Sequence, residues 1–133
     1  MDNAQVLRTV IEDGFGRGDL TVADRFAGPT IAEHEYLAPD GADGVENLRA
    51  HIRIARDEMP GMTMVVEDLV TDGDKVWARA VARFTDPTSG TEVAMTVFDV
   101  CRFEDGRIVE HWGVPDRFAV LHQLGALPPR PPS

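Results

Sequence analysis

The sequence predicts an α+β domain in which helices pack on one face of a curved antiparallel sheet. Before Pro60 and Gly61 the apolar residues recur every three or four positions, which is typical of amphipathic helices. After this pair they alternate with polar residues, which is typical of strands. The loops 72–74 and 104–106 contain Asp-Gly, and short loops of this kind favour antiparallel hairpins. Helices followed by a meander of strands are typical of an α+β fold.

Helices are expected in three places before the meander. Asp2 or Asn3 can cap the first helix, and glycines end it. The sequence Gly28-Pro29 breaks the second. The three helices are expected at about residues 3–15, 21–26 and 45–59, and a short strand is expected at 30–37.

Four strands and a last helix are expected in the second half of the chain. The last helix begins beside Asp116 and ends at Gly125. We expect one domain over residues 1–127, followed by a loose, proline-rich tail over 128–133. The strands are expected at residues 62–70, 75–84, 91–103 and 107–114.

Composition excludes several classes of partner. The 133 residues carry a formal net charge of -10, which disfavours binding to nucleic acid or to an anionic membrane surface. We see neither a signal peptide nor an apolar stretch long enough to cross a bilayer, so we expect a cytoplasmic protein. Cys101 is the single cysteine, and its apolar neighbours indicate a packing role.

The predicted strands are apolar on both faces. In the strand 75–84, alternate small apolar residues fall on one face, whereas Trp77 and Val81 fall on the other. One face can hold the helices and a pocket. The second is large enough for another subunit, since an apolar patch of this size is rare on a monomer. We therefore predict a homodimer that forms through the sheet.

Several segments together resemble a known family. The resemblance covers roughly residues 5–126, and its most specific part is the segment Phe-Glu-Asp-Gly-Arg-Ile-Val-Glu-His-Trp at 103–112, followed by Asp116. Further matching segments are 59–61, 66–70, 73–79 and 123–125. On these residues the chain resembles the SnoaL-like polyketide cyclases, within the superfamily of nuclear transport factor, ketosteroid isomerase and limonene epoxide hydrolase.

The resemblance implies a fold and a chemistry. The fold is a cone, open at one end, made by a curved antiparallel sheet with the N-terminal helices on its concave face. In the family's cyclases an aspartate in the position of Asp116 is the general acid/base of an intramolecular aldol closure that uses neither metal nor organic cofactor. From the residues alone Asp116 has a second interpretation, because an aspartate before a helix is a common N-cap.

His34 is the second candidate catalytic residue. It shares a strand face with Tyr36, and the two glutamates beside it, Glu33 and Glu35, point to the other face. An imidazole suits proton transfer near neutral pH, and the Tyr36 hydroxyl can donate to an enolate oxygen. The alternative is a surface strand with one hydrogen-bonded histidine.

Other residues are candidates for substrate contacts. His111 and Trp112 are consecutive, so only one of them lines the cavity, and alternation does not decide which. Trp77, Phe98 and Met95 are candidates for an apolar pocket wall, with ordinary core packing as the alternative.

The histidines His51 and His122 are expected at the surface. We expect no metal site, because the segment 33–35 alternates across a strand and no histidine pair has helical spacing.

The favoured function is a cyclisation of the aldol type on an apolar, carbonyl-bearing small molecule, without a cofactor. Isomerisation, dehydration and epoxide opening are alternatives on the same fold, the last through Asp99 with Arg79 or Arg102. A dimeric ligand-binding module without catalytic activity is a third possibility, because a fold alone does not determine a function.

Overall fold

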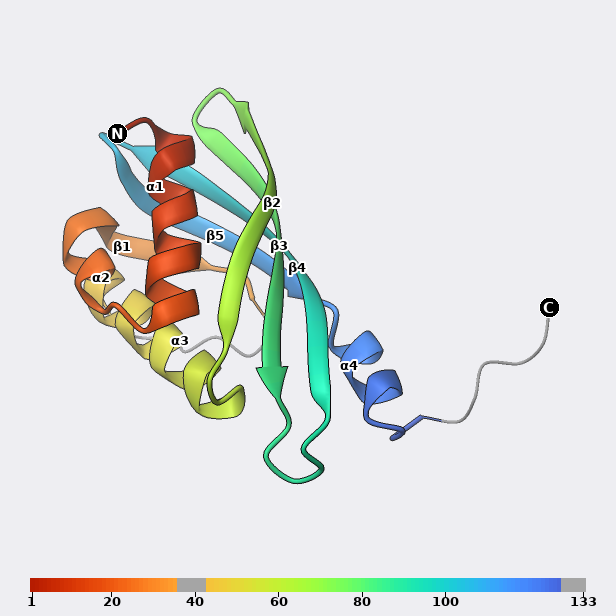
Figure 1. Cartoon of the computed structure of the whole chain (residues 1–133). Coiled ribbons are helices and arrows are strands. Elements are labelled where there is room, and N and C mark those ends of the chain that lie inside the picture. The colour runs from red at the N-terminus through yellow and green to blue at the C-terminus, as the bar shows by residue number, and fades with distance from the viewer. Residues whose placement is uncertain (36–42, 128–133) are drawn as a thin grey trace.

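A five-stranded sheet curves around the N-terminal helices in the computed structural model, which describes residues 1–35 and 43–127 (Figure 1). The strand order is β1-β5-β4-β3-β2, and every neighbouring pair is antiparallel except β1 and β5, which run parallel. The strands are β1 (Ala27–Glu33), β2 (Thr63–Asp72), β3 (Lys75–Thr85), β4 (Glu92–Glu104) and β5 (Arg107–Pro115).

The helices begin at residues whose side chains cap them. Asp2 and Gln5 form a reciprocal capping box at the first helix, and Asp43 accepts a hydrogen bond from the backbone N–H of Glu46 at the third. The helices are α1 (Asn3–Thr9), which continues as the π-helical turn η1 (Val10–Phe15), α2 (Thr21–Phe26), α3 (Gly44–Glu58) and α4 (Arg117–Gln123).

The core lies between the concave face of the sheet and the helices α1, α2 and α3. Strand alternation sends one set of side chains inward, and these are small in β3, where Val76, Ala80 and Ala82 are fully buried. Small residues at these positions let the helices approach the curved sheet. Larger side chains, such as Leu7 and Ile52, then fill the space from the helical side.

Helix α3 lies very close to β1. A Cβ atom added at Gly44 would overlap the carbonyl oxygen of Gly28, so glycine is required at this approach. This contact holds α3 against the strand, and α3 carries a histidine of the site described below.

The predicted fold class, the three N-terminal helices and the four-stranded meander are confirmed. The first strand differs, because it begins at Ala27 and contains Gly28 and Pro29, which we expected to break the chain before it. β1 is an edge strand, where a residue without a backbone N–H is tolerated. The end of the predicted strand 30–37 and the proline-rich tail lie outside the described residues.

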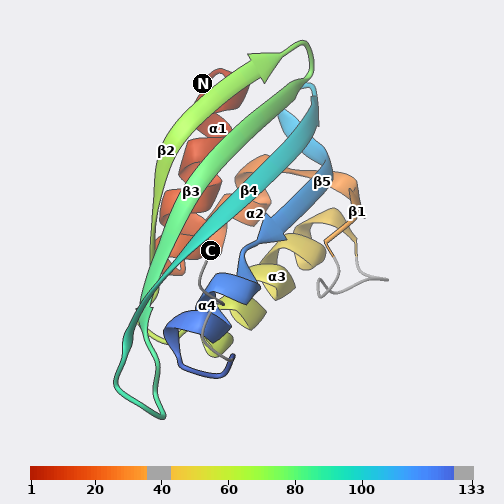
Figure 2. The same ribbon diagram turned by 90° about the vertical axis from the view of Figure 1, so that its right-hand side faces the viewer.

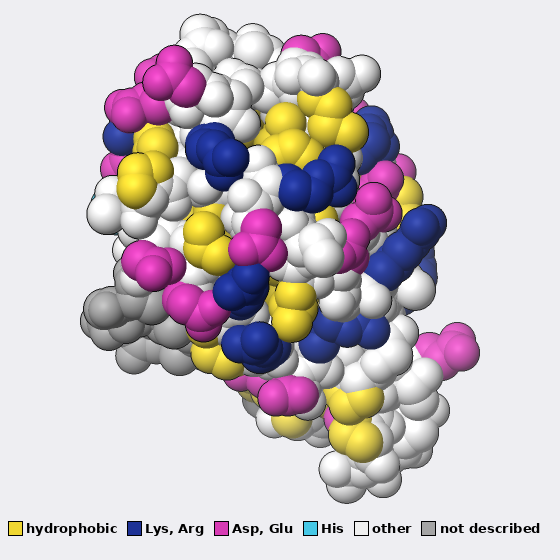
Figure 3. Space-filling view, turned by 90° about the vertical axis from the view of Figure 1, so that its left-hand side faces the viewer, with side chains coloured by type: hydrophobic (Ala, Val, Ile, Leu, Met, Phe, Trp, Pro, Cys, Tyr) yellow, Lys and Arg dark blue, Asp and Glu magenta, His cyan; other side chains and the backbone are white. Residues whose placement is uncertain are grey.

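The two sides of the molecule differ in character. Figure 3 shows the side that carries α1, α2 and α3, where acidic and basic side chains are mixed with scattered apolar ones. Figure 2 looks onto the outer, convex face of the sheet. Within the described part of the chain, no helix has the length and apolar character needed to span a membrane.

Candidate active site

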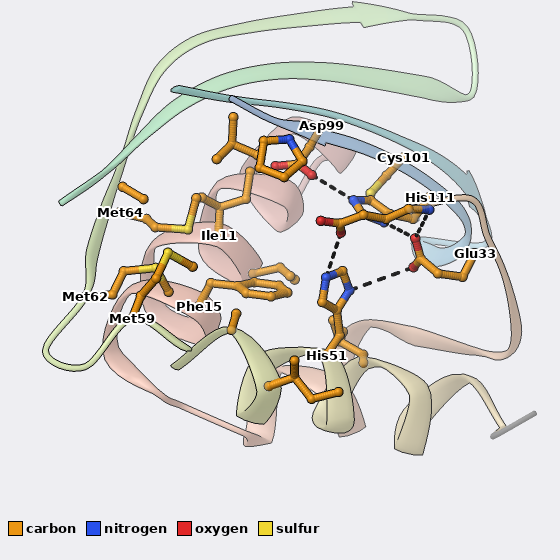
Figure 4. A pocket seen from close by; sticks show the side chains of 18 of the residues that line it. Ile11, Phe15, Glu33, His51, Met59, Met62, Met64, Asp99, Cys101 and His111 are labelled. Carbon is orange, nitrogen blue, oxygen red and sulfur yellow. Dashed lines mark hydrogen bonds and ion pairs between the residues drawn. The ribbon is translucent and has the colours of Figure 1, made fainter. Parts of the chain in front are cut away.

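A cavity of about 80 Å³ lies between the sheet and the helices. Its walls are mostly apolar, with methionine thioethers from the start of β2 and the turn before it, and Phe15 from η1 (Figure 4). At the rim, Arg117 of α4 and Glu58 of α3 form an ion pair of 3.5 Å between partly exposed side chains. The apolar wall residues include Leu7, Val10, Ile11, Leu48, Met59, Met62, Met64, Met95 and Val97.

Five ionisable side chains meet at the other end of the cavity, here called the inner end. Their side chains are between 7% and 13% exposed, so they are largely shielded from bulk water. They come from four elements that are distant in sequence. This carboxylate–imidazole cluster consists of Glu33, Glu35, His51, Asp99 and His111.

His111 is held between two carboxylates. Its Nδ1 lies 2.6 Å from Glu33 Oε1, and its Nε2 lies 2.7 Å from Asp99 Oδ1. The strand register explains the contacts, because Glu33 pairs directly with His111 across β1 and β5, and Asp99 lies diagonally across β4 and β5. Burial alone would lower the pKa of His111, but the hydrogen bonds and charges of Asp99 and Glu33 raise it to about 10. The ring is therefore an imidazolium at neutral pH.

His51 approaches the same carboxylates from α3. Its Nε2 lies 2.7 Å from Glu35 Oε2, whereas its Nδ1 lies 3.9 Å from Glu33 Oε2, beyond hydrogen-bond distance. The edge of Phe15 packs against the His51 ring, with 5.1 Å between the ring centroids. The His51 imidazole is thus oriented by the carboxylate of Glu35 and by the ring of Phe15.

The two glutamates remain ionised despite their burial. Burial raises the pKa of a carboxyl group, but the hydrogen bond and charge of His111 lower the pKa of Glu33 below its usual value. For Glu35 the same opposition holds, and His51 is the main group that lowers its pKa. Each glutamate therefore depends on a histidine from another element.

Gly113 has no side chain, and this leaves room for the side chains of the carboxylate–imidazole cluster. It follows His111 by two positions on β5 and so points to the same face. A Cβ atom there would lie 2.9 Å from His111 Cε1, and 3.1 Å from both Asp99 Oδ1 and Glu35 Oε2. A side chain at this position would displace the hydrogen-bonded groups.

Four of the five residues of the cluster form a set that could hold a metal ion. Ligand atoms of Glu33, Glu35, His51 and His111 lie within 4.8 Å of one another. Strand alternation does separate His34 from the two glutamates, as expected. Alternation within one strand could not predict, however, that His51 of α3 and His111 of β5 approach the two glutamates. A metal would have to replace the protons that now join these groups, since the short contacts use the same atoms.

Comparison with known proteins agrees with this architecture. The family model of the SnoaL-like polyketide cyclases matches residues 5–124. The chain belongs to the SnoaL-like polyketide cyclase family. No curated protein matches the chain.

Three solved structures illustrate the likeness. IdmH from Streptomyces antibioticus, provisionally assigned as a polyketide cyclase, is 30% identical, with 94% of this chain and 99% of that chain covered and a TM-score of 0.81. TsrD from Streptomyces laurentii is 28% identical, with 96% and 99% covered and a TM-score of 0.77. A provisionally assigned polyketide cyclase from Acidithiobacillus ferrooxidans is 22% identical, with 94% and 96% covered and a TM-score of 0.83, which shows a shared fold.

Two of the predicted SnoaL-like site residues, His111 and Met95, line the cavity. His34 and Trp112 lie on the opposite face of the sheet, where their rings stack with 4.9 Å between centroids. There His34 Nε2 contacts Glu110 Oε2 at 2.8 Å. This corrects the prediction that His34 faces the pocket, and it decides the orientation of β5: His111 points inward and Trp112 outward.

The remaining predicted residues lie elsewhere. Trp77 and Phe98 are 51% and 53% exposed on the outer face, because each is out of phase with the inward residues of its strand. Their assignment to a pocket wall is corrected accordingly. Asp116 is exposed and accepts a hydrogen bond of 3.0 Å from the backbone N–H of Ala119, so its side chain is used as the N-cap of α4. Tyr36 lies outside the described residues.

The prediction that His51 lies at the surface was wrong, although a signal was present. His51 follows Leu48 by three positions and precedes Ala55 by four, so it belongs to the apolar face of α3. Asp99 carried a similar signal, because it is in phase with the inward residues Val97 and Cys101. In both elements, an ionisable residue at a position where the pattern predicts a buried apolar residue indicated the site.

The raised pKa of His111 predicts a dependence of stability on pH. Its folded pKa of about 10 lies above the value of 6.5 for a free histidine, so its stabilising effect is complete below pH 6.5 and is lost as the pH rises towards 10. Urea unfolding between pH 6.5 and 10 should show a free energy of unfolding that falls by up to about 1.4 kcal/mol per pH unit from this group. Glu33 and Glu35 act oppositely, since their effect is lost as the pH falls below their free value of 4.5.

Substitution separates His111 from the other titrating groups. His111→Gln should remove the alkaline part of this dependence, and His34→Gln, a change on the outer face, should retain it. Parallel pH profiles for wild type and His111→Gln would show that His111 is not the group responsible.

Proposed function

We propose that this SnoaL-like protein is an enzyme that cyclises an apolar, carbonyl-bearing small molecule by an aldol-type reaction, using acid–base chemistry of its own side chains. The observation that carries the proposal is the carboxylate–imidazole cluster at the inner end of an apolar cavity. Perturbed ionisable groups that converge in a cavity are typical of catalytic sites.

His51 is the proposed general base. When its Nε2–H is directed to Glu35, the lone pair is on Nδ1. Nδ1 lies 3.9 Å from Glu33 Oε2, so it is not hydrogen-bonded to that carboxylate. After Nδ1 accepts a proton, the carboxylates of Glu33 and Glu35 stabilise the imidazolium that forms. A histidine oriented by a carboxylate is the arrangement on which many proton-transfer sites depend.

His111 is the proposed stabiliser of negative charge. Its imidazolium is fixed by Glu33 and Asp99, and its ring centroid lies 5.6 Å from that of His51. Both ring N–H groups are used by carboxylates, so its effect on an enolate is electrostatic. A fixed charge in a site of low dielectric stabilises a transition state more than the same charge does in water.

The steps balance without an external reactant. His51 removes a proton from the carbon beside a carbonyl group, which produces an enolate. The enolate carbon forms a bond to a second carbonyl carbon of the same molecule, and the second carbonyl oxygen becomes an alkoxide. The proton held by His51 then passes to this alkoxide, so that base and product are both neutralised.

Isomerisation and dehydration begin with the same proton removal, and the cluster supports them equally. The epoxide-opening alternative required an arginine beside Asp99. Arg79 instead pairs with Asp68, and Arg102 pairs with Glu104 and Glu110, all on the outer face. Neither arginine lines the cavity, so the structure gives this alternative no support.

We also propose that the outer face of the sheet joins two copies of the chain. Cross-strand register places Val70, Trp77, Val100 and Trp112 in one row over β2, β3, β4 and β5. Phe98 and Val114 lie in the next row, beside the ion pair of Arg79 and Asp68, and both are more than half exposed. A row of apolar side chains across four strands is suited to form the apolar core of a homodimer interface.

Replacing His51 tests the proposed reaction. His51→Gln should lower the rate of α-proton exchange into an aryl methyl ketone in deuterated buffer by about 10²–10⁴-fold, because it removes the base. NMR loss of the α-proton signal measures the rate. Asp116→Asn is the informative comparison, and it should leave the rate within about threefold of wild type, since Asp116 caps a helix. A large loss in Asp116→Asn with full activity in His51→Gln would reverse the assignment.

A charged residue on the outer face tests the proposed dimer. Phe98→Glu should convert a dimer into a monomer when the molar mass is measured by light scattering, because it replaces a large exposed apolar side chain of the proposed interface with a charged one. Phe118→Glu, at a more exposed phenylalanine on α4, should leave the dimer intact. A wild-type monomer, or dissociation only by Phe118→Glu, would contradict an interface through the sheet.

A further inference from the structure

The inner end of the cavity carries more negative than positive charge. Three carboxylates, Glu33, Glu35 and Asp99, meet two imidazoles there. Even with both imidazoles protonated, the formal sum of these five groups is negative. The excess lies in a region where water is scarce and charges act strongly on one another.

No other cation compensates this excess within the described lining of the cavity. Arg117 is the one lysine or arginine there, and its charge contributes to the lowered pKa of Glu35. Its side chain nevertheless lies at the rim, 45% exposed, where it pairs with Glu58. The rim pair is neutral as a whole and does not change the sign of the inner end.

The cluster also presents hydrogen-bond acceptors rather than donors. Both ring nitrogens of His111 are engaged with carboxylates, and His51 directs Nε2 to Glu35. By contrast, Glu35 and Asp99 each use one carboxylate oxygen, and their second oxygens make no hydrogen bond to another described residue. An ionised carboxylate accepts hydrogen bonds and donates none.

Charge and hydrogen-bonding capacity therefore select the same kind of ligand group. We infer that the group placed against this cluster is an uncharged or cationic hydrogen-bond donor, such as a phenol or enol hydroxyl, and that carboxylate ligands of the same shape are rejected. The inference deepens the proposed function, on which it rests for the use of this cavity. A carboxylate ligand would bring an additional negative charge into the cavity, lose its hydration and meet like charges, and these effects oppose binding. An enolate formed in the cavity does not change the net charge of the site, because His51 takes up the proton that the substrate loses.

Three ligands with one skeleton separate the effects of charge from those of shape. At pH 7.5, 2-naphthol is neutral, 2-naphthylmethylamine is cationic and 2-naphthoate is anionic. Isothermal titration calorimetry of the full chain should show that 2-naphthol and 2-naphthylmethylamine bind at least tenfold more tightly than 2-naphthoate. Equal or tighter binding of the naphthoate, or no binding of any of the three, would overturn the inference.

Matched substitutions locate the preference. Glu35→Gln should reduce the ratio of naphthol to naphthoate affinity at least threefold, because it removes one negative charge and adds a donor. Asp99→Asn should reduce the ratio in the same direction, and it provides the test if Glu35→Gln fails to fold. Glu67→Gln is the control, since Glu67 is exposed on β2 and does not line the cavity, and its ratio should equal that of wild type. A ratio that is unchanged in both cluster variants would place the preference outside the cluster and overturn the inference.

Gly113→Ala gives an independent test of location. Its Cβ atom would enter the space beside Asp99 and Glu35, so naphthol affinity should fall at least tenfold. Unaltered affinity would show that the ligand does not reach the inner end. These binding results are distinct from the proton-exchange assay: absent exchange with the expected ligand preference would refute the proposed function alone, and normal exchange with tight naphthoate binding would refute the inference alone.

Discussion

The hydrogen-bonded imidazolium of His111 is the interaction on which the interior of this protein depends. It joins β1 to β4 through β5, because Glu33 and Asp99 contact its two ring nitrogens. Without this cation, buried carboxylates would face one another across the cavity. Removing one partner of a buried ion pair typically destabilises a protein by about 3–5 kcal/mol, since the remaining charge is left uncompensated. The same pairing keeps the carboxylates ionised and thereby sets the charge that any ligand meets.

Strand alternation divides the possible chemistry of the sheet between two surfaces. On β5, His111 and Gly113 face the cavity, whereas Trp112 and Val114 face outward. At these positions the cavity receives the imidazole of His111 and the outer face receives the indole ring of Trp112. This separation explains how one curved sheet can carry both the candidate site and the apolar outer surface through which we propose that two copies join.

Much of the fold could be predicted from the sequence, because its signals are local. The change of apolar period at Pro60 and Gly61 and the Asp-Gly loops determine the meander, and the predicted strands agree with the structure to within a few residues. The site was harder to predict, because its residues come from β1, α3, β4 and β5. Their contacts depend on the parallel pairing of β1 with β5 and on the close approach of α3, which no local pattern specifies. Asp116 had two interpretations, a catalytic one from its position in the family's pattern and a local one as an N-cap, and in the structure its side chain forms the N-cap bond.

The structure places His111 as a buried cation held by two carboxylates, Glu33 and Asp99. Imidazole ¹⁵N chemical shifts, followed from pH 5 to 11 and assigned by comparison with His111→Gln, measure its protonation directly. The account predicts that both ring nitrogens of His111 remain protonated through neutral pH and titrate with a pKa of about 10. A His111 resonance that titrates near 6.5, or that shows a neutral ring at pH 7, would contradict it.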